Sequence, residues 1–363
     1  MSLLFWTDPH LGLNRTSHTT PVSRVKLRDA LYTQANNILN RSHIEGHSAI
    51  CLGDLFDTTD NEEAVIAQGA SIAGRCALVL SGNHDLANRD GKMSSLELIG
   101  HLSPDSSVAL ADSTSDYFVV EFPEANVIVV PHKRTQTLFD LTLQEIGLHV
   151  RRIPTKVNIL VLHCNYESPF ATDDSSLNLT RDIAGLLLGD DHDTKQTVDY
   201  ILIGHEHIPR ADFGGKLQIL GNTHPTSFSD ISDKFIWEFD GTKLSPVKIW
   251  SKDSHLVKDW EWLLNETSTA PTTLDMELVF AGMQFIEING TAPARKLPEI
   301  AKAVQKLWSQ APDALMIRNN VKSEAVQVEA KEMNRALDIP SRITEELQGS
   351  PFANTWANYL SRI

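Results

Sequence analysis

Short apolar runs alternate with longer amphipathic segments over the first part of the chain. The runs are Leu3–Thr7, Ala49–Leu52, Ala77–Leu80, Ile159–Leu162 and Tyr200–Ile203. Runs of that length predict buried strands. Between them, Val25–Asn40 and Glu62–Ala73 have the spacing of amphipathic helices. The alternation therefore predicts an α/β domain with buried strands.

The pattern changes from about residue 213. Lys216–Leu220, Lys234–Phe239 and Val247–Trp250 predict antiparallel strands, with a turn at Gly241. We interpret them as closing the second sheet of the same domain. A linker rich in Thr, Ser and Pro follows at Asn265–Thr273.

Beyond the linker, the pattern predicts a strand, a helix and a strand at Met276–Ile288, Pro298–Gln310 and Ala314–Asn319, and then a helical tail. This divides the chain into a large domain (1–264), a small α+β module (274–330) and a tail (331–363). In the tail, Phe352, Trp356, Tyr359, Leu360 and Ile363 form one apolar stripe at helical spacing after Ser350-Pro351. Two interpretations of this stripe remain open: it packs on the chain itself, or it docks a partner.

Composition narrows the class of protein. The chain has 363 residues, 41% of them hydrophobic and 22% charged, as in ordinary globular proteins. No apolar stretch reaches the ~18 residues of a membrane span, and the N-terminus leaves no room for a signal peptide. Cys51, Cys76 and Cys164 form no C-x-x-C pair, which predicts buried thiols in a reducing cytoplasm.

The formal net charge of −15 does not favour broad electrostatic attraction to nucleic acid. Three basic patches counter this locally: Arg24–Arg28, His132–Arg134, and Arg151–Arg152 with Lys156. A solvated surface is the simpler interpretation of each.

Polar ligand-type residues follow each of the apolar runs directly. They form five motifs in order: Asp8-Pro-His10, Gly53-Asp54 within GDLFD, Gly82-Asn83-His84-Asp85, His163, and Gly204-His205-Glu206-His207. Each motif alone is weak, and a single histidine after a strand is most often a core residue. Residues on short loops at the carboxyl ends of strands build the active sites of open α/β sheets. The ordered set therefore predicts one composite site.

Two divalent ions about 4 Å apart need a bridging group and several ligands each. Asp54 is the natural bridging carboxylate. Asp8 and His10, two residues apart, can reach one ion from the same side of an extended segment, and His205 and His207 repeat this geometry. Asn83 offers a carbonyl oxygen. Mixed imidazole and oxygen ligands suit manganese, zinc or iron, whereas a structural zinc site would be closed and rich in thiolates.

The motif set resembles the signature of the calcineurin-like metallophosphoesterase superfamily over about residues 1–250. The resemblance implies a four-layer αββα sandwich, with Asp8, His10, Asp54 and His207 on one ion and Asp54, Asn83, His163 and His205 on the other. It implies that His84, held by Asp85, serves the leaving oxygen as a catalytic residue. The two ions are expected to be Mn²⁺.

Two narrower features resemble the SbcD-like DNA-repair exonuclease branch: GDLFD, and Gly221–Phe228, where Asn222 departs from the usual Ser. The chain is short for that branch, which is typical of a phage or a compact bacterial version. The branch implies a DNA-capping role for the small module, a homodimer and an SbcC-like ATPase partner, since the chain has no P-loop. Ser94–Leu102 offers a dimer face, with packing on its own sheet as the equal alternative. A phosphoprotein phosphatase, a small-phosphodiester hydrolase and a non-catalytic scaffold remain as alternatives.

Overall fold

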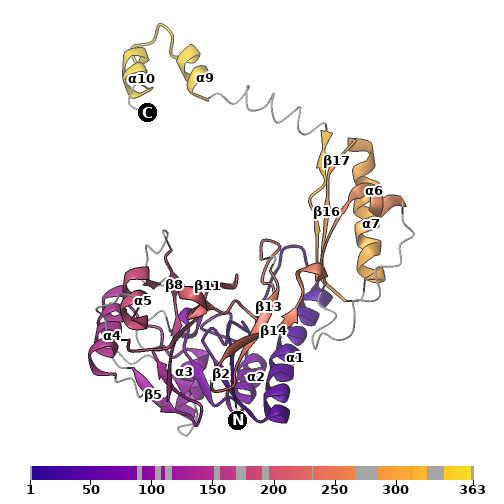
Figure 1. Ribbon diagram of the computed structural model, residues 1–363. Coiled ribbons are helices and arrows are strands. Elements are labelled where there is room, and N and C mark those ends of the chain that lie inside the picture. The colour runs from indigo at the N-terminus through magenta and orange to yellow at the C-terminus, as the bar shows by residue number, and fades with distance from the viewer. Residues whose placement is uncertain are drawn as a thin grey trace. The chain divides into compact units, whose positions relative to one another are not determined.

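The computed structural model (Figure 1) describes residues 2–87, 92–102, 108–110, 117–150, 156–168, 177–189, 196–230, 232–265, 284–311, 313–324 and 339–360. Contacts divide them into two units. The first holds the described residues up to His255 together with 284–285 and 313–316, and the second holds the remainder. Arg151, Arg152, the linker 266–273 and Ile363 lie outside the described residues.

Two six-stranded sheets form the centre of the first unit. One has the order β14 (Leu244–Trp250), β13 (Lys234–Phe239), β1 (Ser2–Trp6), β2 (His47–Cys51), β3 (Leu78–Leu80) and β4 (Val108–Ala109). The other has the order β11 (Arg210–Asp212), β12 (Leu217–Ile219), β10 (Tyr200–Gly204), β7 (Val157–His163), β6 (Ala125–Val129) and β5 (Phe118–Glu121). Strands β1 to β4 of the first sheet are parallel, and so are β12, β10, β7 and β6 of the second. In each sheet the carboxyl ends of these strands therefore meet at one edge.

Helices cover the outer side of each sheet. They are α1 (Pro21–Glu45), α2 (Glu63–Ala73), α3 (Ser95–Leu102), α4 (Gln136–His149) and α5 (Arg181–Leu188). Helix α1 begins before the predicted residue because Thr20 and Ser23 form a capping box around Pro21, and it ends at Gly46 in a left-handed conformation. Shorter elements are β8 (Asn165–Tyr166), β9 (Asn178–Leu179), and 3₁₀ turns at Asn83–Asp85, Phe213–Gly215 and Lys252–Ser254.

The alternation of side chains along β1 sorts the core into layers. Leu3 and Phe5 face the second sheet, where they pack with Val127 and Ile159, among others. Leu4 and Trp6 point the other way, into a cluster that contains residues of α1, α2 and α3. A third cluster joins the outer side of the second sheet to α4 and α5, which lie beside that sheet in Figure 1. The predicted four-layer αββα sandwich is therefore confirmed.

One sequence-based assignment of sheet geometry is wrong, and another holds in part. Strands β13 and β14 extend the first sheet, not the second, because Leu3 pairs with Phe239 and Phe5 with Trp237. Strand β12 lies in the second sheet and is antiparallel to β11, as predicted, but it is parallel to β10. An alternating pattern predicts a strand but does not specify which sheet edge it joins.

The remaining elements are β15 (His255–Asp259), α6 (Trp260–Asn265), β16 (Gln284–Asn289), β17 (Thr291–Ala292), a 3₁₀ turn at Ala294–Lys296, α7 (Leu297–Gln310), β18 (Ala314–Asn319), β19 (Lys322–Ser323), α9 (Ile339–Glu346) and α10 (Ala353–Leu360). Strands β15, β16 and β18 form one small sheet. The predicted strand–helix–strand order is confirmed for β16, α7 and β18. Phe285, Leu315 and Met316 pack with Trp250 in the core of the first unit.

Among the residues described, no helix has the length and apolar character needed to cross a membrane. All three cysteines are buried free thiols, as the sequence predicts.

Candidate metal centre

The seven predicted ligands converge at the carboxyl ends of five strands of the first unit. Asp8 and His10 follow β1, Asp54 follows β2, Asn83 follows β3, His163 ends β7, and His205 and His207 follow β10. The loops after β1 and β2 lie side by side: the amide of Asp8 donates to the Gly53 carbonyl (3.1 Å) and that of His10 to the Asp54 carbonyl (3.1 Å). These bonds bring the side chains of Asp8, His10 and Asp54 together at one site.

Several ligand residues have strained backbones. Asp8, His10, Asp54 and His205 have φ values of 54°, 45°, 49° and 90°, in the left-handed region that residues other than glycine seldom adopt. Each such residue costs about 1–3 kcal/mol, and strain of this kind concentrates at functional sites. Gly82 is required for a related reason, because a Cβ atom there would overlap the Asp54 carboxylate.

One group of ligands comprises Asp8, His10 and His207, whose ligand atoms lie within 4.8 Å of one another. The Nε2 atoms of the two histidines are 3.2 Å apart. Asp8 is fully buried; its Oδ2 accepts from the Thr7 hydroxyl and from the His205 amide (3.0 Å), while its Oδ1 has no hydrogen-bond partner. A buried carboxylate oxygen without a donor is costly, so this group fits a cation.

A second group comprises Asp54, His163 and His205, within the same 4.8 Å limit. Nε2 of His163 lies 3.3 Å from Asp54 Oδ2 and 3.1 Å from the Asn83 side-chain oxygen, which is also 2.9 Å from Nδ1 of His205. The predicted ligands thus form two adjacent groups. Asp54, predicted to bridge, lies in this second one.

Backbone and hydroxyl groups fix the ring orientations. His163 Nδ1 is 2.7 Å from the Leu52 carbonyl, so Nδ1 carries the proton and Nε2 is free to bind a metal. His207 Nδ1 is 3.1 Å from the Thr226 hydroxyl, which leaves its Nε2 for the site. Second contacts of this kind are typical of metal-binding histidines.

The electrostatics suit cation binding. Burial raises the pKa of Asp54, but the adjacent His163 outweighs it, so the net shift is downward. Burial lowers the pKa of His163, yet the Asp54 carboxylate raises it to about 9. Burial and the nearby His163 lower the pKa of His205 to about 4. An ionised carboxylate beside neutral imidazoles is the form that binds metal, and a bound cation would displace the His163 proton.

His84 and Asp85 differ from the expected arrangement. The ring of His84 is held by the Asp57 carbonyl, 2.6 Å from Nδ1, and not by Asp85. Asp85 is buried and accepts from the amides of Leu55 (3.2 Å), Phe56 (3.2 Å) and Gly82 (2.9 Å), which ties two ligand loops together. Burial, with Asp54 nearby, raises the Asp85 pKa to about 7.

Four side chains that were not predicted complete the site. Arg15, Asp57 and Thr226 line a cavity of about 280 Å³ with His10, Asp54, His84, His205 and His207. The Arg15 Nε donates to the Thr226 carbonyl (3.1 Å). Lys234 is fully buried behind His207 and donates to its carbonyl (3.0 Å). No strand or helix pattern singles out Arg15 or Lys234.

Lys234 gives a stability prediction. Its ammonium contacts Asp230, whose other oxygen accepts from the Thr226 amide (3.1 Å) and the Asn222 side chain (2.9 Å). Lys234→Met removes one partner of a buried ion pair and leaves the Asp230 charge uncompensated. We expect the free energy of unfolding to fall by about 3–5 kcal/mol, measured by urea denaturation.

The matched control is Lys248→Met, because Lys248 pairs with Asp233 at 2.7 Å on the surface, with 42% of its side chain exposed. An exposed pair contributes less than about 1 kcal/mol. Equal losses for the two variants would contradict the role assigned to Lys234.

Comparison with known proteins places the chain in a family. The family model described as calcineurin-like phosphoesterase matches residues 1–209, a span that contains all seven ligands. No curated protein matches the chain.

Among solved structures, the chain is similar to TT1561 of Thermus thermophilus, at 8% identity and a TM-score of 0.40, covering 68% of this chain and 98% of that one. The 5'-nucleotidase precursor from Thermus thermophilus has 12% identity and a TM-score of 0.38, covering 68% and 54%. The Haemophilus influenzae NAD nucleotidase has 12% identity and a TM-score of 0.34, covering 68% and 49%.

Proposed function

Because the chain belongs to the calcineurin-like phosphoesterase family, we propose that its metal centre hydrolyses phosphodiester bonds in DNA, as a nuclease subunit of an SbcCD-like repair or recombination complex. Membership of this family and the two ligand groups support a more general activity than DNA cleavage, the metal-dependent hydrolysis of phosphoesters. The single observation that carries this activity is the paired ligand groups around Asp8 and Asp54, with His84 beside them in one cavity.

The residues present define the chemistry. Two divalent ions held by these ligands would bind phosphate oxygens and supply hydroxide at neutral pH. His84 is placed to protonate the leaving sugar oxygen, since its Nδ1 proton is committed to the Asp57 carbonyl and its ring packs edge-on to that of His10, 5.3 Å between centroids. Arg15 is placed to neutralise phosphate charge at the same cavity.

The segment Gly221–Phe228 supports the SbcD-like branch. Thr226 orients His207, and the departure from the branch, Asn222, is fully buried and donates to Asp230. The segment is therefore part of the support of the metal centre, with Asn222 in a structural role.

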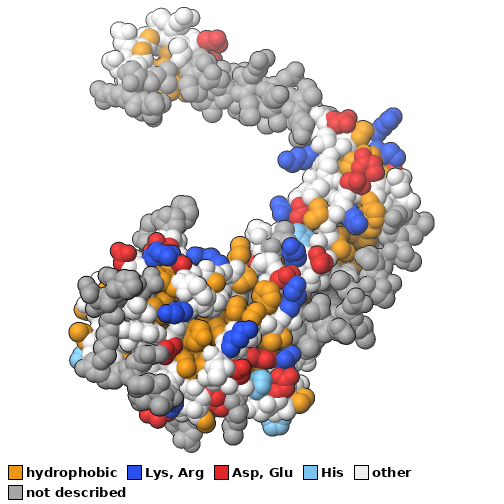
Figure 2. All heavy atoms as spheres, in the orientation of Figure 1, with side chains coloured by type: hydrophobic (Ala, Val, Ile, Leu, Met, Phe, Trp, Pro, Cys, Tyr) orange, Lys and Arg blue, Asp and Glu red, His pale blue; other side chains and the backbone are white. Residues whose placement is uncertain are grey.

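Surface charge favours a localised contact with DNA. On the face drawn in Figure 2, Lys and Arg side chains are interspersed with Asp and Glu. With a net charge of −15, attraction to a polyanion depends on bound cations and on local arginines near the centre.

The test is a cleavage assay with purified protein and Mn²⁺ on linear duplex DNA, single-stranded DNA, a phosphopeptide and bis(4-nitrophenyl) phosphate. Cleavage of DNA supports the proposal. Turnover of the phosphopeptide alone would indicate a phosphoprotein phosphatase, and turnover of the small diester alone would indicate a small-phosphodiester hydrolase. No turnover of any substrate would indicate a non-catalytic scaffold.

The tail supports a docking role for an SbcC-like ATPase. Helices α9 and α10 contact each other through a bond from Trp356 Nε1 to the Thr344 hydroxyl (2.9 Å). Leu347, Phe352, Thr355 and Trp356 line an open apolar hollow of about 510 Å³. Phe352 is 67% exposed, as expected of an aromatic anchor that awaits a partner.

We expect Phe352→Ala combined with Trp356→Ala to abolish co-purification with the ATPase subunit. Nuclease activity and melting temperature of the isolated chain should not change, because the hollow lies in the tail. A lower melting temperature without any partner would show that the aromatic pair serves the fold of the chain itself.

We also propose a homodimer through α3. Leu96 and Ile99 are buried in the core of the first unit, so only Leu102, which is 73% exposed, remains for such a face. Leu102→Glu should convert a dimer into a monomer in sedimentation experiments, and an unchanged mass would exclude this face.

A further inference from the structure

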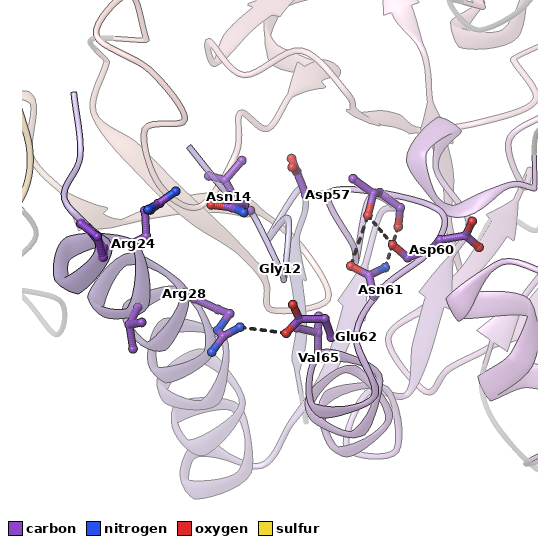
Figure 3. Close-up of a pocket in the computed structure, with 13 residues that line it drawn as sticks. Gly12, Asn14, Arg24, Arg28, Asp57, Asp60, Asn61, Glu62 and Val65 are labelled. Carbon is purple, nitrogen blue, oxygen red and sulfur yellow. Dashed lines mark hydrogen bonds and ion pairs between the residues drawn. The ribbon is translucent and has the colours of Figure 1, made fainter. Parts of the chain in front are cut away.

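A second cavity, of about 500 Å³, adjoins the metal centre. It lies between the start of α1 and the loop before α2, as Figure 3 shows. Asp57 lines both cavities, and its Oδ1 lies 3.4 Å from Nδ1 of the ligand His10. A molecule in this second cavity, which we call the α1 cleft, would therefore be a direct neighbour of any phosphate bound at the metal centre.

Charges in the α1 cleft are paired with one main exception. Glu62 binds Arg28 (3.3 Å), as the dashed line in Figure 3 marks, and Asp60 binds Lys92 (3.3 Å). Among the described residues, no side chain pairs with the guanidinium of Arg24. Arg24 also sits in the first turns of α1, where its amide donates to the Thr20 carbonyl (3.0 Å), so its backbone is fixed.

The rest of the lining suits a nucleoside. Pro21 and Val25 provide exposed apolar surface against which a base or sugar can pack, the buried Leu13 and Val65 close the cavity behind them, and Asn14 provides an exposed amide. The side-chain amide of Asn61 donates to the Thr58 carbonyl (2.7 Å) and to the Ser95 hydroxyl (3.1 Å), so Asn61 lines the cavity without offering these hydrogen bonds to a ligand. Small-molecule sites typically combine an apolar lining with a few placed polar groups.

We propose that the α1 cleft binds the nucleotide next to the scissile bond, with Arg24 as the ligand of that nucleotide's phosphate. This inference rests on the proposed function and assigns to it a subsite for a single nucleotide of the strand. Asp57, between the cleft and His10, keeps the flanking phosphate out of the metal centre by charge repulsion. An unpaired arginine suits this role because a guanidinium donates two hydrogen bonds to one phosphate.

The test compares two substrates under Mn²⁺: a fluorescent oligothymidylate, and bis(4-nitrophenyl) phosphate, which has no flanking phosphate. Arg24→Ala should raise KM for the oligonucleotide at least roughly tenfold, the effect of losing a hydrogen-bonded contact between charged groups. The salt dependence of log KM should fall by about 0.7, one phosphate contact to a single strand. kcat for the oligonucleotide and both constants for the small diester should not change.

Two controls separate the outcomes. Lys26→Ala removes the same charge from an exposed position of α1 outside the cleft and should behave as wild type. Arg24→Lys keeps the charge and should recover most of the lost KM. If Arg24→Ala matches Lys26→Ala while wild type cleaves the oligonucleotide, the cleft assignment is wrong and the nuclease function stands. If wild type hydrolyses only the small diester, the nuclease function fails, and this subsite fails with it.

Discussion

Asp54→Asn should reduce turnover of any phosphodiester by about 1,000-fold, since a metal ion contributes several kcal/mol to transition-state stabilisation. Asp54 is buried, and its Oδ2 lies beside His163 in the second ligand group. Asparagine keeps the size of the side chain but removes the charge that would bridge the two cations of the proposed centre. Metal content, measured by elemental analysis after dialysis, should fall below two ions per chain.

The control is Asp57→Asn, for which we expect a smaller loss of turnover. Asp57 lies 3.4 Å from Nδ1 of His10, whereas Nε2 of that ring faces His207. Loss of such an outer contact typically costs about 10–100-fold, with the metal retained. Chelation should abolish turnover by wild type, and added Mn²⁺ should restore it. Full activity in the metal-free protein would overturn the two-metal assignment.

The ligand set was predictable because its signal is local. Each ligand follows an apolar run directly, and parallel strands bring their carboxyl ends together whatever their order in the sheet. The sequence could not predict how each side chain is held. Asp85 is next to His84 in sequence, but it accepts from the amides of Leu55 and Phe56 in the loop after β2, and from the Gly82 amide in its own loop.

Buried polar residues account for most of what the sequence pattern missed. Near the start of β6, a strand that the sequence analysis left out, the buried side-chain amide of Asn126 donates to the side-chain oxygen of Asn158 (3.0 Å). Lys234, at the start of β13, has the character of a surface residue until Asp230, four residues earlier, is seen to neutralise it. Pairing across a fold satisfies such groups, and a single sequence carries little sign of it.

The sequence pattern also gave no sign that residues beyond the predicted linker pack with Trp250. Phe285, Leu315 and Met316 are hydrophobic residues of strands. The alternation of side chains along a strand is equally compatible with their packing in the small module and in the large domain. Their packing with Trp250 depends on long-range contacts. The same limit applies to Arg15 and Arg24, whose importance comes from the cavities that they line.

His84→Ala should lower the rate on an unactivated diester, such as a dinucleotide, by roughly 10²–10⁴-fold, the usual contribution of a general acid. The ring lies beside the ligand His10 and forms a third cluster of possible ligands with His10 and Asp57, apart from the two groups that contain Asp8 and Asp54. Because the two ions are assigned to those two groups, metal content should stay at the wild-type value. Its proton is needed only where the leaving oxygen is a poor leaving group. The loss should therefore shrink strongly on bis(4-nitrophenyl) phosphate, because a nitrophenolate departs without protonation.

His84→Asn is the matched variant for this prediction. Its amide can still donate to the Asp57 carbonyl, which holds the native ring at 2.6 Å, but it has no ionisable nitrogen. A general-acid role requires the asparagine variant to be as slow as the alanine variant on the dinucleotide and nearly as fast as wild type on the nitrophenyl ester. Equal losses on both substrates, accompanied by a missing metal ion, would instead make His84 a ligand. Recovery of the dinucleotide rate in His84→Asn would reduce the residue to a hydrogen-bonding support for the loop that carries Asp57.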